Sequence, residues 1–289
     1  MIPTRFSYTA PTTVEEALAA LASDPGARVL AGGQSLIPAM SLRRVAPSAL
    51  VDLGRISGLA GISDRGPGGV RLGTSVTLEE LAASSLVSAR AAALADAAAV
   101  AGDVQVRRRG TLGGAIADGH PAGDLIAAAI ALDGSVTLLG RDGARSVPAP
   151  EIVTGPYSTV IGQGEILTGL DVPAVPGRTG SAYIKLRHPG SNYAICGAAA
   201  AVALDERGAV IALRLALAGA VDRPCLVPGV ALPADPGSDA GPREAARAVE
   251  AAGLPFVSDL AASGEYRAHL APILAARATG AALRRARDA

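Results

Sequence analysis

Two Gly-Gly turns, each with a hydroxyl residue close by, constrain this chain more than any other feature. The first is Ala31-Gly32-Gly33-Gln34-Ser35, which follows a short apolar run, and the second is Thr111-Leu112-Gly113-Gly114. Residues without a side chain let backbone N–H groups approach an oxygen closely, and the Ser or Thr adds a hydroxyl donor. Either loop alone is more often only a turn. Two loops of one design, however, can clamp the two phosphates of a dinucleotide.

The spacing of these glycines excludes the two commonest nucleotide-binding turns. Neither loop has the G-x-G-x-x-G spacing of a Rossmann turn, and neither ends in the Lys-Ser or Lys-Thr of a P-loop. Any nucleotide is therefore expected to bind in a different fold.

Composition narrows the class of protein further. The 289 residues are enough for two modest domains, and 26 basic against 26 acidic side chains leave no net charge to attract nucleic acid or anionic lipid. No stretch approaches the roughly 18 apolar residues of a membrane span, and residues 1–12 lack the layout of a signal peptide. With only Cys196 and Cys225, we expect a cytoplasmic protein without structural disulfides or a four-thiolate cluster of its own.

Local signals predict alternating helices and strands in the first 172 residues. Thr13 to Glu16 and Thr77 to Glu80 are capping boxes, which mark helix starts. A helix is also expected over 88–99 and a loop over 107–114. Strands are expected over the following apolar runs: 28–31, 50–53, 70–73, 135–139 and 166–172.

Pro173, Pro176 and Gly177 indicate a boundary, after which the pattern changes. Residues 181–187, 194–204 and 210–217 have the length and separation of a three-stranded antiparallel meander. Helices are expected over 242–252 and 266–287, with a surface loop over 233–241.

The two loops also carry a family resemblance. The motifs A-G-G-Q-S and T-L-G-G-x-x-x-x-G-x-P-x-x-D, which ends at Asp124, resemble those of the FAD-binding, or medium, subunit of the molybdenum hydroxylases. That family includes aerobic carbon monoxide dehydrogenase and bacterial xanthine dehydrogenase-type enzymes. The likeness covers nearly the whole chain and includes the following residues: Ile2-Pro3, Phe6 to Tyr8, Tyr183-x-Lys185-x-Arg187, Tyr193-Ala194 and Glu265-Tyr266-Arg267.

The resemblance implies an α+β fold with two domains. Residues 1–176 would form a two-lobed FAD-binding domain of the vanillyl-alcohol oxidase and MurB type, also called PCMH type. Residues 177–289 would form a C-terminal domain with a three-stranded antiparallel sheet and helices.

The resemblance also implies which residues bind the cofactor. The two glycine loops would hold the pyrophosphate, Asp124 would anchor the cofactor, Leu167 would lie against the flavin ring, and Lys185 would sit near its pyrimidine edge. Lys185 is the only lysine of the chain; a surface ion pair is the alternative role for it. The full set of expected FAD-binding residues is Leu30, Ala31, Gly32, Gly33, Gln34, Ser35, Leu36, Gly110, Thr111, Gly113, Gly114, Ala117, Asp118, Asp124, Leu167 and Lys185.

This chain departs from the family pattern in three ways. The family usually has Asn where this chain has Ala115 and Asp118, and an ionised Asp118 near a pyrophosphate would repel it. Ser191-Asn192 replaces a usual Gly-Asp before Tyr193, and His120 replaces a common Asp or Ser.

The function implied is an oxidoreductase subunit that carries electrons but no catalytic residue for the substrate. Electrons from a molybdopterin cofactor in a large partner subunit would pass through the [2Fe–2S] clusters of a small partner subunit to FAD here. The acceptor would then be quinone, NAD or oxygen, and the assembly a dimer of heterotrimers. The alternatives are a stand-alone FAD-dependent oxidoreductase and a scaffold subunit without flavin. His188 and His269 have no ligand partners at metal spacing, so no metal site is expected.

Overall fold

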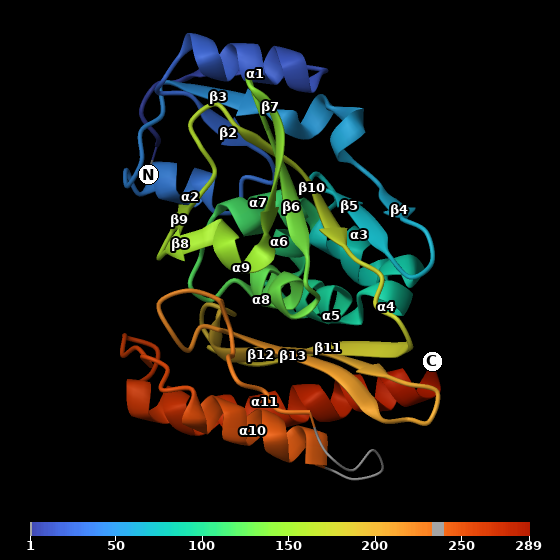
Figure 1. The fold of residues 1–289 in the computed structure, drawn as a ribbon. Helices are drawn as coiled ribbons and strands as arrows, with labels where there is room; N and C mark the ends of the chain where they lie inside the picture. The colour runs from blue at the N-terminus through green and yellow to red at the C-terminus, as the bar shows by residue number, and fades with distance from the viewer. Residues whose placement is uncertain (1, 233–239) are drawn as a thin grey trace.

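The computed structural model describes residues 2–232 and 240–289 and shows an α+β fold in three layers (Figure 1). A small parallel sheet lies nearest the N-terminus, a five-stranded antiparallel sheet with most of the helices lies in the middle, and a four-stranded sheet lies against two C-terminal helices. The expected surface loop over 233–241 falls almost entirely outside the described residues. Within the described ranges, no helix has the length and apolar character needed to cross a membrane.

The first lobe consists of three parallel strands in the order β1-β3-β2 with two helices. Its elements are β1 (Ser7–Thr9), α1 (Val14–Ser23), β2 (Arg28–Leu30), α2 (Leu36–Ser41) and β3 (Ala49–Asp52), followed by the 3-10 helices η1 (Leu53–Arg55) and η2 (Ser57–Leu59). Ala17 and Leu21 of α1 pack with Val51 of β3 in a small separate core.

The middle lobe is an antiparallel sheet in the order β4-β5-β10-β6-β7. Its strands are β4 (Ile62–Asp64), β5 (Val70–Gly73), β6 (Ser135–Gly140), β7 (Gly143–Pro148) and β10 (Ile166–Val172). Its helices are α3 (Leu78–Ala83), α4 (Ser85–Arg90), α5 (Ala92–Val100), α6 (Val104–Arg109), α7 (Leu112–Ala117), α8 (Asp124–Ala131) and α9 (Ala149–Ile152), and a hairpin of β8 (Val153–Gly155) and β9 (Ser158–Thr159) follows α9.

Both predicted capping boxes are confirmed. The Thr13 hydroxyl accepts from the Glu16 N–H at 3.2 Å, and the Glu16 carboxylate accepts in return from the Thr13 N–H. Thr77 and Glu80 repeat this exchange at the start of α3. These local hydrogen bonds satisfy N–H groups that the first helical turn leaves free, so the two starts are visible in sequence.

Two predictions for the middle lobe were wrong. The helix expected over 88–99 is two helices, α4 and α5, which break at Ala91. The loop expected over 107–114 contains the end of α6 and the start of α7. The reason is capping: Asp103 accepts from the Val106 N–H at 2.8 Å, and Thr111 accepts from the Gly114 N–H at 3.1 Å. The two glycines therefore belong to a helix, despite their low helix propensity.

The predicted meander in the C-terminal part is confirmed for three strands, but the sheet has a fourth. Its strands are β11 (Arg178–Arg187), β12 (Ala194–Leu204), β13 (Val210–Ala218) and β14 (Cys225–Leu226), each antiparallel to the next. The two residues of β14 pair with Leu217 and Ala216 of β13. So short a strand has no alternation of side chains that a sequence pattern could reveal.

Helices cover both faces of this sheet. α10 (Ala240–Ala251) packs on α11 (Gly264–Asp288), which contacts β11 and β12, so both predicted C-terminal helices are confirmed. On the other face, α5 lies against β11, and α8 lies against β12 and β13. The middle lobe is thereby packed directly onto the C-terminal sheet (Figure 1).

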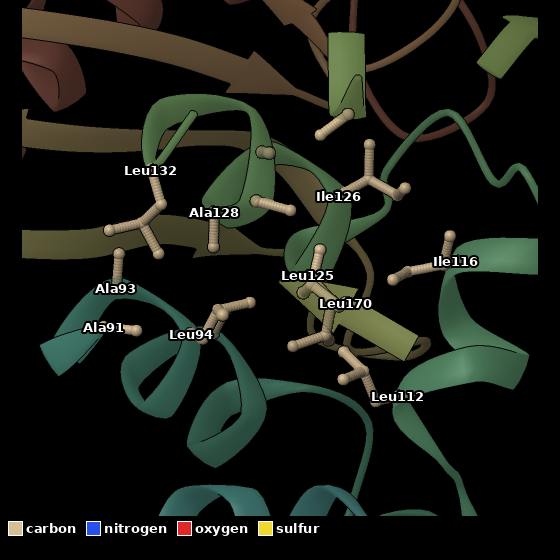
Figure 2. Packing of buried hydrophobic residues seen from close by; sticks show 14 of the residues in the cluster. Ala91, Ala93, Leu94, Leu112, Ile116, Leu125, Ile126, Ala128, Leu132 and Leu170 are labelled. Atoms are coloured by element: carbon tan, nitrogen blue, oxygen red, sulfur yellow. The ribbon is translucent and has the colours of Figure 1, made fainter. Parts of the chain in front are cut away.

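The main hydrophobic core lies between these layers. Every residue of α8 is buried, and Figure 2 shows its Leu125 and Ile126 among Leu94 of α5, Leu112 of α7 and Leu170 of β10. Alanines fill much of the rest of α5 and α8, and their small side chains permit close approach of the two helices.

Replacing Leu94 with Ala tests this packing. Leu94 is fully buried, and truncation of such a leucine leaves a cavity that costs about 2–5 kcal/mol. We expect the urea midpoint of Leu94→Ala to fall accordingly, whereas Leu260→Ala, at a fully exposed position, should unfold like the parent. Equal midpoints for both variants would contradict the assigned core.

Candidate functional site

The first glycine loop connects β2 to α2 and presents unpaired backbone donors. The N–H groups of Gly32, Gly33, Gln34 and Ser35 make no hydrogen bond with any group in the described part of the chain. Gly33 has a φ of 73°, which a residue with a side chain rarely adopts. The Ser35 hydroxyl does not cap α2, and this residue is exposed. Four successive backbone donors without a partner are a donor set suited to phosphate oxygens.

The second glycine loop is built differently, because its N–H groups already have partners. Leu112 donates to the Val76 carbonyl at 2.9 Å, Gly113 donates to the Thr74 carbonyl at 2.8 Å, and Gly114 donates to the Thr111 hydroxyl. The Thr111 hydroxyl keeps its own proton for donation to a ligand. The first loop therefore offers the backbone donors, and the second offers a hydroxyl on a firmly held backbone.

The structure brings the two loops into contact. A Cβ on Gly32 would overlap the Arg109 carbonyl oxygen and would lie 2.8 Å from the Gly110 Cα. Gly110 in turn faces the Gln34 side chain. Gly32 is thus required for the close approach of two segments that are far apart in sequence.

Leu167 is joined to the second loop through Thr74. The Thr74 hydroxyl donates to the Leu167 carbonyl at 2.9 Å, and the Thr74 carbonyl accepts from Gly113. The Leu167 side chain is buried in the main core. The remaining residues expected in the site lie at the ends of secondary-structure elements. Leu30 is the last residue of β2, Leu36 the first of α2 and Ala117 the last of α7, and Asp118 follows α7 directly.

Asp124 and Lys185 form a buried ion pair between the middle lobe and the C-terminal sheet. Lys185 Nζ lies 2.7 Å from Asp124 Oδ2 and also donates to the Asn192 carbonyl at 2.9 Å. The side chains are only 2% and 7% exposed, so the partner of Lys185 is a buried carboxylate and not a surface one. The Tyr183 hydroxyl donates to the other oxygen of Asp124.

Burial sets the protonation of this group. Burial raises the pKa of the Asp124 carboxyl, while the charge and hydrogen bond of Lys185 act to lower it. Burial, followed by the charge of Asp124, raises the pKa of the Tyr183 phenol well above 10. Tyr183 therefore keeps its proton and acts as a donor to Asp124.

A cluster of three rings lies near this pair and was not predicted from the sequence. The His120 ring stacks on Tyr193 with centroids 4.0 Å apart and meets Tyr157 edge-on at 5.0 Å. His120 Nδ1 accepts from the Ala122 N–H, so the proton of the neutral ring is on Nε2, which faces the Tyr157 hydroxyl. Burial lowers the pKa of His120, and the charge of Asp118 acts against that shift. Tyr157 comes from the distant β8–β9 hairpin, so no local signal could have placed it here.

Two surface hollows lie elsewhere. One, of about 320 Å³, is lined by residues such as Arg65 and Asp171, and the other, of about 410 Å³, by residues such as Glu15 and Arg71. None of the predicted site residues lines either hollow.

Comparison with known families agrees with this geometry. Residues 4–175 match the FAD binding domain in molybdopterin dehydrogenase, and residues 181–282 match the CO dehydrogenase flavoprotein C-terminal domain. The chain belongs to the FAD-binding medium subunits of the molybdopterin dehydrogenases.

Individual relatives support the same membership. The chain is 41% identical to the carbon monoxide dehydrogenase medium chain of Hydrogenophaga pseudoflava over 75% of each chain. It is 33% identical to the nicotine 6-hydroxylase medium subunit of Paenarthrobacter nicotinovorans over 90% of this chain and 91% of that one. These relatives are oxidoreductase subunits, as the sequence predicted.

Solved structures of the family have the same fold. Carbon monoxide dehydrogenase from Hydrogenophaga pseudoflava superposes with a TM-score of 0.91 at 36% identity, covering 99% of both chains. Quinoline 2-oxidoreductase from Pseudomonas putida 86 gives 0.89 at 31% identity, again over 99% of both chains. The predicted fold class is confirmed, apart from the additional strand β14.

Gly32→Ala tests whether the loop contact matters for the cofactor of this FAD-binding subunit. The new Cβ would push the first loop away from Arg109 and Gly110 and misplace its free donors. Loss of one hydrogen bond to a charged group costs about 1.5–3 kcal/mol, so FAD affinity should fall about tenfold or more. The measurement is a fluorescence titration of the folded chain with FAD.

Gly58→Ala is the matched control for this variant. Gly58 has open space where a Cβ would lie, so this change should leave FAD affinity as it was. If Gly32→Ala binds FAD as tightly as Gly58→Ala does, the first loop is not part of the site.

Proposed function

We propose that this chain holds FAD between its two glycine loops and the Asp124–Lys185 pair, and passes electrons through it within a molybdenum hydroxylase complex. The observation that carries the proposal is the row of four unpaired N–H groups from Gly32 to Ser35, held against the second loop. This donor set fits a pyrophosphate. Family membership supports FAD as the molecule that bears it.

The remaining predicted residues would serve the other parts of the cofactor. Leu30 and Leu36 flank the first loop, which begins at Ala31. Gly110, Ala117 and Asp118 flank the second loop, and Leu167 is joined to it through Thr74. When bound, FAD accepts and releases electrons singly or in pairs, so it can link one-electron carriers to a two-electron acceptor. The role of this chain is then to bind and orient the cofactor and to set its electrostatic surroundings.

Lys185 supplies the charge in this arrangement. An ammonium group near a flavin favours the reduced form, on which negative charge accumulates. Asp124 keeps that ammonium at a fixed position, because the pair is nearly sealed from water. A surface lysine with free rotamers would not provide such a fixed charge.

The complex would contain a large molybdopterin-binding subunit and a small subunit with [2Fe–2S] clusters, assembled as a dimer of heterotrimers. Support comes from the relatives, which include a 6-hydroxypseudooxynicotine dehydrogenase complex subunit alpha and a xanthine dehydrogenase FAD-binding subunit. The electron acceptor would be quinone, NAD or oxygen. We place the complex in the cytoplasm, which agrees with two cysteines that are both free.

The proposed division of the chain is a FAD-binding domain over 1–176 and a C-terminal domain over 177–289. The two family matches end at residue 175 and begin at residue 181, on either side of this boundary. The strand order supports it as well, because among the described residues β11 to β14 pair only with one another.

Isolation of the native complex through a tag on this chain tests the proposed assembly. We expect two further chains to co-purify, with molybdopterin and [2Fe–2S] iron detected in the same fractions. Purification of the chain alone, with FAD and substrate-oxidising activity, would instead indicate the stand-alone oxidoreductase.

Asp118→Asn tests the local departure from the family pattern. Removal of a negative charge near the phosphates should raise FAD affinity several-fold, because like charges repel more strongly at low effective dielectric. Asp142→Asn, in the exposed turn between β6 and β7, removes the same charge far from the loops and should change nothing. Equal affinities for the two variants would place Asp118 outside the range of the pyrophosphate.

A further inference from the structure

Tyr183, Asp124 and Lys185 form a buried chain of hydrogen bonds that ends in a charged group. The Tyr183 hydroxyl donates to Asp124 Oδ1, and Lys185 Nζ donates to Asp124 Oδ2 at 2.7 Å. The whole of Tyr183 is 4% exposed. Buried charges are tolerated only when their hydrogen-bonding capacity is largely satisfied. Here the Tyr183 hydroxyl is the donor to one of the two carboxylate oxygens of Asp124, and Lys185 is the donor to the other.

Lys185 itself retains capacity for a ligand. An ammonium group has three N–H donors, and the described part of the chain accepts only two of them, through Asp124 and the Asn192 carbonyl. The third donor has no acceptor among the described residues. With its side chain 2% exposed, Lys185 could offer that donor only to a molecule bound directly against it.

Contacts at its backbone N–H and around its hydroxyl hold Tyr183 in place. Its backbone N–H donates to Asp96 Oδ2 at 3.1 Å, and Asp96 is held by Arg285 at 2.6 Å. Across the sheet, a Cβ on Gly197 would overlap the Tyr183 hydroxyl, so only glycine leaves room for the phenol there. Two separate constraints thus place this hydroxyl against Asp124.

We propose that Tyr183 is a positioning residue for the flavin site, whose hydroxyl holds Asp124 in place and draws off part of its charge so that Lys185 presents a net positive charge and a free N–H to the cofactor. Without the phenol, both carboxylate oxygens can turn toward Lys185 and neutralise its ammonium more completely. The inference rests on the proposed function, since it assumes that FAD binds beside Lys185.

The first test is the midpoint potential of FAD bound to the full chain carrying Tyr183→Phe. The variant keeps the ring and removes only the hydroxyl. We expect FAD to remain bound but its potential to shift downward, equivalent to a change of about three- to tenfold in the affinity ratio of reduced to oxidised flavin. Tyr266→Phe is the control, because Tyr266 is 45% exposed on α11 and its hydroxyl makes no hydrogen bond with the described residues.

A second readout needs no flavin. Because Lys185 is the only lysine, ¹⁵N-lysine labelling gives a single side-chain ammonium signal. In the parent chain this signal should exchange slowly with water, as expected for a buried, hydrogen-bonded ammonium. Tyr183→Phe should shift the signal, and so should Gly197→Ala, which displaces the phenol without removing it. Tyr266→Phe should not.

The outcomes separate the two proposals. If the parent chain takes up no FAD, the proposed function fails, and the lysine signal still decides whether Tyr183 positions Lys185. If FAD binds but folded Tyr183→Phe matches Tyr266→Phe in both potential and lysine signal, the positioning role of Tyr183 is overturned. Should Tyr183→Phe not fold, an unchanged lysine signal in Gly197→Ala overturns it equally.

Discussion

The buried ion pair between Lys185 and Asp124 joins the middle lobe to the C-terminal sheet. Asp124 begins α8 and Lys185 lies on β11, so the pair forms only when the two parts are packed together. Breaking a buried pair by removing one partner costs about 3–5 kcal/mol. A second ion pair, between Asp96 of α5 and Arg285 of α11, ties both helices to the backbone of β11 at Tyr183 and Ser181. The position of the Lys185 ammonium therefore depends on this interface.

Each of the three layers contributes a different kind of group to the proposed site. The first lobe contributes unpaired backbone donors at Gly32 to Ser35, and the middle lobe contributes a second loop whose N–H groups are already used to hold its own backbone. The C-terminal sheet contributes Lys185, a single fixed cation. On the proposed function, a chain with no net charge would bind an anionic dinucleotide through these few local donors and not through its overall electrostatic field.

Features encoded within a few residues could be predicted from the sequence. The Thr13 and Thr77 capping boxes and the three long strands of the C-terminal sheet have local signals, and the structure confirms them. The predicted pairing of the glycine loops rested on their shared composition, and the structure brings the loops together. Features set by distant residues could not be predicted: the strand β14, the helix that contains Gly113 beside Thr74, and the stack of His120 on Tyr193 with Tyr157 at its edge. These depend on contacts that no local pattern records.

The central claim is that this chain holds one FAD in the site between the loops and Lys185. The most direct measurement is the visible absorption spectrum of the purified full chain, followed by identification of the cofactor released by acid. We predict a two-band flavin spectrum and about one FAD per chain, consistent with a single site. A folded chain that is colourless and takes up no added FAD would contradict the claim and would identify the chain as a scaffold subunit.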